Sequence, residues 1–307
     1  MTMSGQNSNI APPIAFIGFG EAAGAFVEGW RSVGPISVTA FDIKTNNAQT
    51  RDGKLADYVN FAVTPANNAV DVVKDAKMVF SAVTAEAAVD AARSVATALK
   101  PGMIYLDINS CAPSRKREAA EIVTNAGASY VDVAVMAPVY PTRHKTPLLM
   151  GGPGVKIAED LLKNMEMKFE VVSDKVGDAS TIKMIRSVMI KGIEALVSES
   201  IVAAVQEGID DKIIQSLDVT FPGMDWEKRA GYMLERMVRH GKRRAEEMRE
   251  VAKTMDDLGI GGIMASATAT REQLVSDLDL MDAFDGSPPE DHKILANAIL
   301  AAHKEQK

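Results

Sequence analysis

A lysine on an otherwise apolar helix is the residue of this sequence best suited to move a proton. The segment VGDASTIKMIRSVMIKGIEA, residues 176–195, predicts a helix of mostly Met, Ile, Val and Ala with Lys183 near its start. At about 100° per residue, the polar residues fall in one narrow sector. They are Lys183, Ser187, Lys191, Glu194 and Ser198. A helix that is apolar over most of its circumference is mostly buried, so this polar stripe must line a cleft or find internal partners.

Two interpretations of Lys183 follow from this periodicity with equal weight. In the first, the helix runs between two domains, its polar stripe lines the gap, and Lys183 exchanges a proton with a substrate hydroxyl. In the second, Lys183 lies on a solvated helix face or pairs with a carboxylate. The rest of the sequence decides between them.

A glycine-rich turn near the N-terminus could bind a dinucleotide. The predicted strand 14–18 runs into IGFGEAAGAF, in which Gly18, Gly20 and Ala23 form the pattern G-x-G-x-x-A before a helix. Gly18 permits a tight turn, Gly20 lets the backbone approach a pyrophosphate, and Ala23 lets the helix pack close to the strand. The start of that helix would face the phosphates, so we expect three more cofactor contacts. They are Phe19, Glu21 and Ala22.

Asp42 ends the second predicted strand and is expected to accept hydrogen bonds from the adenosine ribose hydroxyls. A carboxylate repels a 2′-phosphate, so Asp42 favours NAD over NADP, while Lys44 and Thr45 lie close enough to leave NADP open. The alternative is a glycine-rich turn without a ligand.

The pattern of elements around this turn predicts an α/β domain followed by a helical one. Six runs predict strands, at 14–18, 36–42, 59–63, 77–83, 103–107 and 129–135, with helical patterns between them. This alternation predicts a Rossmann-type, doubly wound parallel sheet covered on both faces. Five later segments predict only helices, at 179–207, 210–218, 226–258, 263–279 and 290–305. We therefore expect a disordered lead-in (1–12), a dinucleotide-binding Rossmann domain (13–178) and an all-α domain (179–307).

Ligands of open α/β sheets bind at the carboxyl ends of the strands. Val83 and Thr84 follow the fourth predicted strand, and Asn109 and Ser110 follow the fifth. We expect all four beside the cofactor or the substrate. An N-cap cluster for the next helix is the alternative for Asn109 and Ser110.

Composition limits the classes of partner. The 307 residues carry a net charge of −7, so a nucleic-acid surface is not expected. No apolar run reaches the roughly 20 residues that span a bilayer, and the polar N-terminus lacks the features of a signal peptide. Cys111 is the single cysteine, which suits a reducing cytoplasm, and the four scattered histidines show no metal-ligand spacing. We expect a cytoplasmic protein without a metal, a membrane contact or a nucleic-acid partner.

With these motifs the chain resembles the β-hydroxyacid dehydrogenases, which include 6-phosphogluconate dehydrogenase and 3-hydroxyisobutyrate dehydrogenase. It looks closest to the branch with a phosphogluconate-dehydrogenase-like C-terminal domain of unassigned function. IGFGEAAGAF matches the family's cofactor motif, and Gly177, Lys183 and Ser187 match a motif whose lysine transfers the proton. The resemblance therefore implies that Lys183 is the acid or base and that Ser187 helps to orient the reacting oxygen, together with Asn109 or Ser110.

Two family motifs are altered here. The family pattern D-x-P-V-S-G-G, which holds the substrate carboxylate, corresponds to VDVAVMAPVYPTR, with Asp132 kept and Met136-Ala137-Pro138 replacing Ser-Gly-Gly. Arg143, just after it, could bind a carboxylate or phosphate instead, or it could be a surface charge. His240 stands where the family has a lysine, on a basic helix whose ordinary interpretation is a solvated face. The expected substrate contacts are Ser110, Met136, Arg143 and His240.

The resemblance implies an NAD(P)-dependent oxidoreductase that interconverts a hydroxyl and a carbonyl on a small, acidic substrate. It also implies a homodimer formed through the helical domain. The alternatives are an imine reductase, since such enzymes share this architecture, and a sensor that binds the cofactor without catalysis.

Overall fold

The computed structural model describes residues 10–305. The chain divides into two compact units, residues 1–183 and 184–307. Helix α7 (Asp178–Gln206) continues across that division. The predicted boundary at residue 178 is the start of this helix, because the change from strand to helix patterns marks where α7 begins and not where the packing changes.

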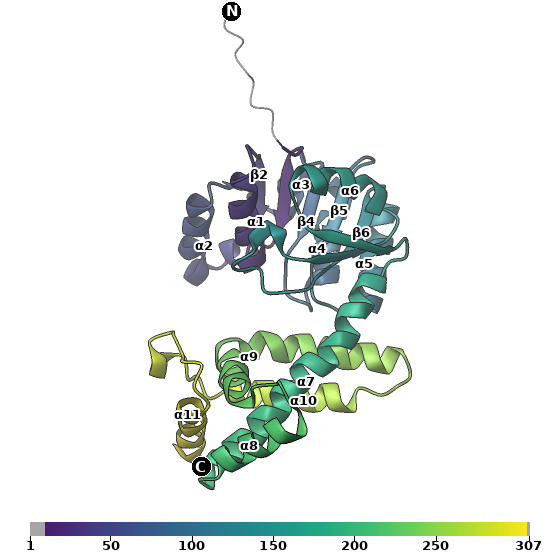
Figure 1. Cartoon of the computed structure of the whole chain (residues 1–307). Coiled ribbons are helices and arrows are strands. Elements are labelled where there is room, and N and C mark those ends of the chain that lie inside the picture. Colours follow the sequence, from purple (N-terminus) through teal and green to yellow (C-terminus); the bar gives the residue numbers. More distant parts are fainter. Residues whose placement is uncertain (1–9, 306–307) are drawn as a thin grey trace, which may run out of the picture. The chain divides into compact units, whose positions relative to one another are not determined.

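The first unit contains an eight-stranded sheet in the order β3-β2-β1-β4-β5-β6-β7-β8. Figure 1 labels β2, β4, β5 and β6 of this sheet. The strands are β1 (Ile14–Ile17), β2 (Val38–Phe41), β3 (Thr64–Pro65), β4 (Met78–Ser81), β5 (Ile104–Asp107), β6 (Ser129–Val135), β7 (Leu148–Gly151) and β8 (Phe169–Ser173). All neighbouring strands pair in parallel except β6 and β7, which are antiparallel. The predicted α/β fold class is confirmed, with two additional strands at one edge.

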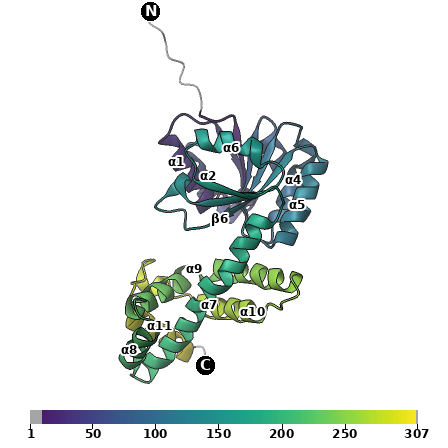
Figure 2. The same ribbon diagram turned by 45° about the vertical axis from the view of Figure 1, so that its right-hand side comes forward.

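Helices cover both faces of this sheet (Figure 2). They are α1 (Glu21–Arg31), α2 (Ala48–Asn60), α3 (Ala69–Val73), α4 (Ala88–Val95), α5 (Pro113–Asn125) and α6 (Val155–Asn164). Ile14 and Phe16 of β1 point into the cluster that contains α1, α2 and α6. Ala15 and Ile17 point into the cluster with α3, α4 and α5. Because strand residues alternate between faces, every position of β1 is buried and the strand reads as a continuous apolar run.

Two local predictions were wrong. The predicted strand 59–63 covers the end of α2 and the turn after it, and β3 is a two-residue strand at Thr64–Pro65. Of the predicted disordered lead-in 1–12, residues 1–9 lie outside the described residues. Ile10 and Ala11 are packed against the core, because the Ile10 N–H donates to Pro35 O over 3.0 Å and Ala11 is buried.

The second unit is helical. Besides its part of α7, it contains α8 (Asp210–Thr220), α9 (Trp226–Asp257), α10 (Ile263–Ser276) and α11 (His292–Glu305), which confirms the predicted all-α region. Its main core joins α7, α9 and α11 through Ile201, Leu234 and Leu295. A smaller core joins α7, α9 and α10 through Met184, Met248 and Ala269. Across residues 10–305, no helix has both the length and the apolarity that a bilayer crossing requires.

Candidate functional site

The turn between β1 and α1 has the sterics of a phosphate-binding loop. Gly18 has φ +80°, and a Cβ atom there would lie 2.8 Å from the carbonyl carbon of Ala82 on the neighbouring strand connection. A Cβ on Gly20 would meet nothing within 4 Å, so the space above this glycine is open. Ala23 is fully buried against the sheet. Each residue of the pattern thus meets the requirement from which its role was predicted.

The N-terminus of α1 is available to an anion. Gly20 is its N-cap residue and supplies no side-chain hydrogen bond to the free backbone N–H groups. Glu21 is exposed and Ala22 is partly buried beside this end of the helix. Phe19 differs from the prediction, because its ring packs in the core against Tyr58 and Phe61, which restricts any ligand contact to its backbone. The turn, the open space and the uncapped helix end fit the pyrophosphate of a dinucleotide.

Asp42 is fixed at the carboxyl end of β2. Its Oδ2 accepts a hydrogen bond from the Phe19 N–H over 2.8 Å, and its Oδ1 accepts one from the Lys44 N–H over 2.9 Å. A carboxylate has about four acceptor positions, so two backbone bonds leave capacity for ribose hydroxyls. Lys54, a buried residue that sequence analysis did not select, supports the same turn by donating to Phe19 O over 2.7 Å and to Asp57.

Asn109 holds the ends of two strands together. Its Oδ1 accepts a hydrogen bond from the Val83 N–H over 2.7 Å, and its Nδ2 donates to Ser81 Oγ over 2.9 Å. The Asn109 side chain is buried, whereas Val83 is partly buried and Thr84 is exposed. The amide that was expected to orient a reacting oxygen is therefore engaged inside the protein between β4 and β5.

The structure brings together Lys183 and Ser110, two of the predicted site residues. Lys183 Nζ donates a hydrogen bond to Ser110 Oγ over 2.6 Å, although 73 residues separate them in the chain. Both side chains are partly buried. This contact places the Lys183 amine beside a hydroxyl group near the carboxyl end of β5.

The N-terminus of α7 is held by Asp132 of β6. Its Oδ2 accepts hydrogen bonds from the backbone N–H groups of Gly177, over 3.1 Å, and Ser180, over 3.0 Å, and its Oδ1 accepts one from Ser180 Oγ. Gly177 has φ +102°, which favours glycine, and a Cβ there would approach Arg117. These contacts fix the turn of α7 that precedes Lys183.

The rest of the polar stripe on α7 finds partners within the second unit. Lys191 Nζ pairs with Glu247 Oε2 of α9 over 3.0 Å and lies 3.5 Å from Ser187 Oγ. Ser187 and Lys191 are both buried. The expectation that this stripe lines a gap is therefore wrong from Lys191 onward, because charged residues of α9 and α10 meet it.

A buried arginine is the centre of this network. Arg244 of α9 pairs with Glu194 of α7, and its Nε donates to Glu272 Oε1 of α10 over 3.1 Å. All three side chains are buried. Burial raises the pKa of Glu272, and Arg244 opposes that shift. The network joins three helices by charge.

His240 lies on the basic face of α9. Burial, and then Arg236, Arg243 and Arg239, lower the pKa of His240 to about 4, against a smaller opposing effect of Glu247. The imidazole is therefore neutral at pH 7 and is a hydrogen-bonding group, unlike the lysine that the family has at this position.

Arg143 and Met136, the two candidates that follow β6, have partners elsewhere in the first unit. Arg143 pairs with Glu28 of α1 over 2.8 Å in an exposed ion pair, which agrees with its alternative as a surface charge. Its neighbour His144 is buried against Gly29 of α1. Met136 is partly buried and donates its backbone N–H to Pro147 O over 2.9 Å.

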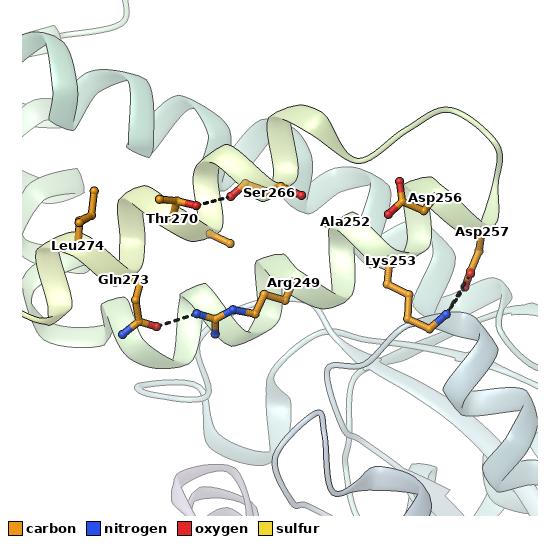
Figure 3. A pocket seen from close by; sticks show the side chains of 10 residues that line it. Arg249, Ala252, Lys253, Asp256, Asp257, Ser266, Thr270, Gln273 and Leu274 are labelled. Carbon is orange, nitrogen blue, oxygen red and sulfur yellow. Dashed lines mark hydrogen bonds and ion pairs between the residues drawn. The ribbon is translucent and has the colours of Figure 1, made fainter.

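An open groove of about 680 Å³ lies between α9 and α10 (Figure 3). Four of its polar side chains form two pairs, Arg249 with Gln273 over 2.8 Å and Lys253 with Asp257 over 3.0 Å. None of the predicted site residues lines it. In the described part of the chain, no three His, Cys, Asp or Glu residues are grouped as a metal ion would need.

Comparison with known proteins agrees with this architecture. Residues 13–173 match the family model described as the NAD binding domain of 6-phosphogluconate dehydrogenase, and residues 204–275 match a domain of unknown function, DUF1932. A conserved hypothetical protein from Sinorhizobium meliloti 1021 is 32% identical, covers 98% of this chain and 100% of its own, and superposes with a TM-score of 0.73.

Two further solved structures are similar. The conserved protein MTH1747, described as structurally similar to 3-hydroxyacid dehydrogenases, is 27% identical over 90% of this chain and 99% of its own, with a TM-score of 0.66. A Mycobacterium tuberculosis 3-hydroxyisobutyrate dehydrogenase, at 16% identity over 94% and 99% of the two chains and a TM-score of 0.68, shares the fold, as imine reductases also do. The match over residues 13–173 covers more than half of the chain, which therefore belongs to the 6-phosphogluconate dehydrogenase-like β-hydroxyacid dehydrogenases, in the branch with a DUF1932 C-terminal domain.

Proposed function

We propose that this protein is an NAD(P)-dependent oxidoreductase that interconverts a hydroxyl and a carbonyl group on a small, acidic substrate. The observation that carries the proposal is the 2.6 Å hydrogen bond between Lys183 Nζ and Ser110 Oγ at the carboxyl end of β5. It lies in the unit whose Gly18–Gly20 turn leaves room for a pyrophosphate. A proton-transfer group and a cofactor site thus belong to one compact unit.

The residues of the chain would divide the work. A bound nicotinamide supplies the hydride acceptor or donor. As a neutral amine, Lys183 takes the proton from the substrate hydroxyl, and as an ammonium it returns that proton to the carbonyl oxygen in the reverse direction. Ser110 accepts a hydrogen bond from Lys183 Nζ in either state and orients the reacting oxygen. Ser187, one turn further along α7, is proposed as a second orienting hydroxyl.

Asp42 is proposed to select NAD. Its two backbone hydrogen bonds fix the carboxylate at the end of β2, where a 2′-phosphate would meet a like charge that cannot turn away. Val83, Thr84, Glu21 and Ala22 are proposed to contact the same cofactor through the ends of β4 and α1.

Recognition of an acidic group is assigned to α9. Three arginines of α9 are close enough to lower the pKa of His240: Arg236, Arg239 and Arg243. Glu235 pairs with Arg239, and Glu247 pairs with both Arg243 and Lys191, so the four cations exceed their two carboxylate partners. The surplus of positive charge on this face suits a carboxylate or phosphate, with His240 as a neutral hydrogen-bond partner. Met136 is proposed as an apolar contact of the substrate.

Imine reduction is the second candidate function, because the Ser-Gly-Gly of the carboxylate-binding motif is replaced by Met136-Ala137-Pro138. The substrate of an imine reductase needs no binding site for a carboxylate group. Lys183 favours the hydroxyl reaction, since a hydroxyl must lose a proton as the hydride leaves.

We also propose that the protein is a homodimer through the helical unit. Ile185, Met189 and Leu196 lie along one face of α7 and are 49%, 62% and 61% exposed in the single chain. The partner that suits this apolar face is the same face of a second copy of the chain, because pairing the two copies would bury both faces at once.

The test begins with fluorescence titration of the full chain with NADH and with NADPH. The cofactor that binds more tightly is then used to screen hydroxy acids, keto acids and cyclic imines. We expect Lys183→Ala to lower kcat by about 10²- to 10⁴-fold and to leave cofactor affinity within about twofold. The matched control is Lys156→Ala, an exposed lysine on α6. A Lys183→Ala enzyme that turns over like the control would disprove the assigned role of Lys183.

A further inference from the structure

Lys116 of α5 is a fully buried lysine between two fully buried aspartates. Its Nζ lies 2.9 Å from Asp107 Oδ1 and 3.4 Å from Asp132 Oδ1, and it also donates to the Asp107 carbonyl over 2.6 Å. All three side chains are 0% exposed. Burial favours the uncharged amine, but Asp107 and Asp132 outweigh it and raise the pKa of Lys116, so the ammonium stays charged. Apolar residues at these three positions could give a similar free energy of unfolding, so stability alone does not explain why the protein has three buried charges here.

Each aspartate is hydrogen-bonded to backbone near one residue of the proposed catalytic pair: Asp132 near Lys183, and Asp107 near Ser110. Asp132 binds the Gly177 and Ser180 N–H groups at the start of α7, three residues before Lys183. Asp107 accepts a 2.9 Å hydrogen bond from the N–H of Asn109, the residue before Ser110, and a 2.8 Å hydrogen bond from Tyr130 OH. Asp107 and Asp132 are opposite each other in the parallel β5–β6 pair, and Lys116 adds a side-chain link between their carboxylates.

The hydrogen bond from Lys183 Nζ to Ser110 Oγ closes these contacts into a ring. We propose that Lys116 is a positioning residue for the reaction proposed above: it joins Asp107 of β5 to Asp132 of β6 and thereby sets the distance between Ser110 and Lys183. Lys116 itself touches neither reacting group. The inference rests on the proposed function for its catalytic consequence but not for its geometry.

A variant that removes all three charges at once tests the positioning role of Lys116 without leaving an unpaired buried charge. Lys116→Met alone leaves two uncompensated buried carboxylates and is expected to destabilise the fold. The variant Lys116→Met with Asp107→Asn and Asp132→Asn removes all three charges and keeps acceptor oxygens for the Gly177, Ser180 and Asn109 N–H groups. It is the protein to compare with the wild type.

The readout that needs no substrate is the NMR spectrum of the full chain after reductive ¹³C-methylation of its lysines, with the Lys183 signal assigned by Lys183→Arg. We expect the Lys183 signal of the triple variant to move to the position of an exposed lysine such as Lys100. Lys54→Met is the matched control, because Lys54 is a buried lysine of the same unit that contacts Phe19 O and Asp57 instead. That variant should leave the Lys183 signal in place.

With a substrate in hand, the triple variant should lose about 10- to 100-fold in kcat, with cofactor affinity within about twofold of the wild type. A Lys183 signal and a kcat that both match the wild type in a folded triple variant would overturn the role of Lys116. A shifted Lys183 signal in a protein that oxidises and reduces nothing would overturn the proposed function and leave the positioning role of Lys116 standing.

Discussion

The two glycines of the β1–α1 turn have different physical roles, although the sequence pattern treats them alike. Gly18 is required by the backbone, with φ +80° and the Ala82 carbonyl in the way of any side chain. Gly20 has φ −102° and open space around it, so only a ligand would exclude a side chain there. The fold needs Gly18, and the cofactor needs Gly20.

This difference predicts the behaviour of two alanine variants. Gly18→Ala should lower the free energy of unfolding by about 1–3 kcal/mol, because alanine is strained at positive φ and meets Ala82. Gly20→Ala should unfold like the wild type and bind the reduced cofactor at least about tenfold more weakly, because its methyl group occupies the space for the pyrophosphate. Thermal unfolding and NADH fluorescence titration measure the two effects. Unchanged NADH affinity in Gly20→Ala would show that this turn does not hold the phosphates.

Helix α7 has two differently supported parts. Its first turns are anchored in the first unit by Asp132, and its later turns are joined to α9 and α10 through Lys191, Glu194 and Arg244. The periodicity of the helix correctly predicted a stripe that needs partners. It could not show that Lys191 pairs with Glu247 and Glu194 with Arg244, residues that lie far along the chain in α9.

Arg244 should be the most sensitive residue of this network. Arg244→Met removes the ion-pair partner of the buried Glu194 and Glu272, which should cost about 3–5 kcal/mol of unfolding free energy in the helical unit. Urea unfolding in a Trp30→Phe background follows that unit through Trp226, the remaining tryptophan, which is buried in its core. Adding Glu194→Gln and Glu272→Gln should recover much of the loss.

The control for Arg244→Met is Lys253→Met, which breaks the half-exposed ion pair with Asp257 on the same helix. That loss should stay below about 1 kcal/mol, because solvent screens exposed pairs. Equal losses in the two variants would mean that the Arg244 network contributes no more than a surface pair.

At the scale of the whole molecule, each unit has its own core, while the exposed apolar face of α7 remains to be covered. We expect light scattering after size exclusion to give a dimer for the wild type. Met189→Glu with Leu196→Glu should give a folded monomer, because four carboxylates would face one another across the interface. Ile157→Glu on α6, at an equally exposed apolar position of the first unit, should remain a dimer. A monomeric wild type would contradict the proposal.

The sequence by itself determined the features that local rules govern. The G-x-G-x-x-A turn, the strand–helix alternation and the 3.6-residue period of α7 depend on neighbouring residues, so the Rossmann sheet, the helical unit and the exposed turn of Gly20 could be predicted. β7 and β8 could not, because short apolar runs such as LLMG do not distinguish a strand from a buried helix segment.

Only the tertiary structure decided which polar groups meet. It paired Lys183 with Ser110, engaged the Asn109 amide between β4 and β5, and turned Arg143 toward Glu28. Lys116 had one local signal, its place on the apolar face of α5 beside Ala119, Ala120 and Val123, all of them buried. Its partners lie at the ends of two different strands. Charges find their partners through space, because burial makes an unpaired charge costly wherever its partner lies in the chain, and no spacing rule records that partner.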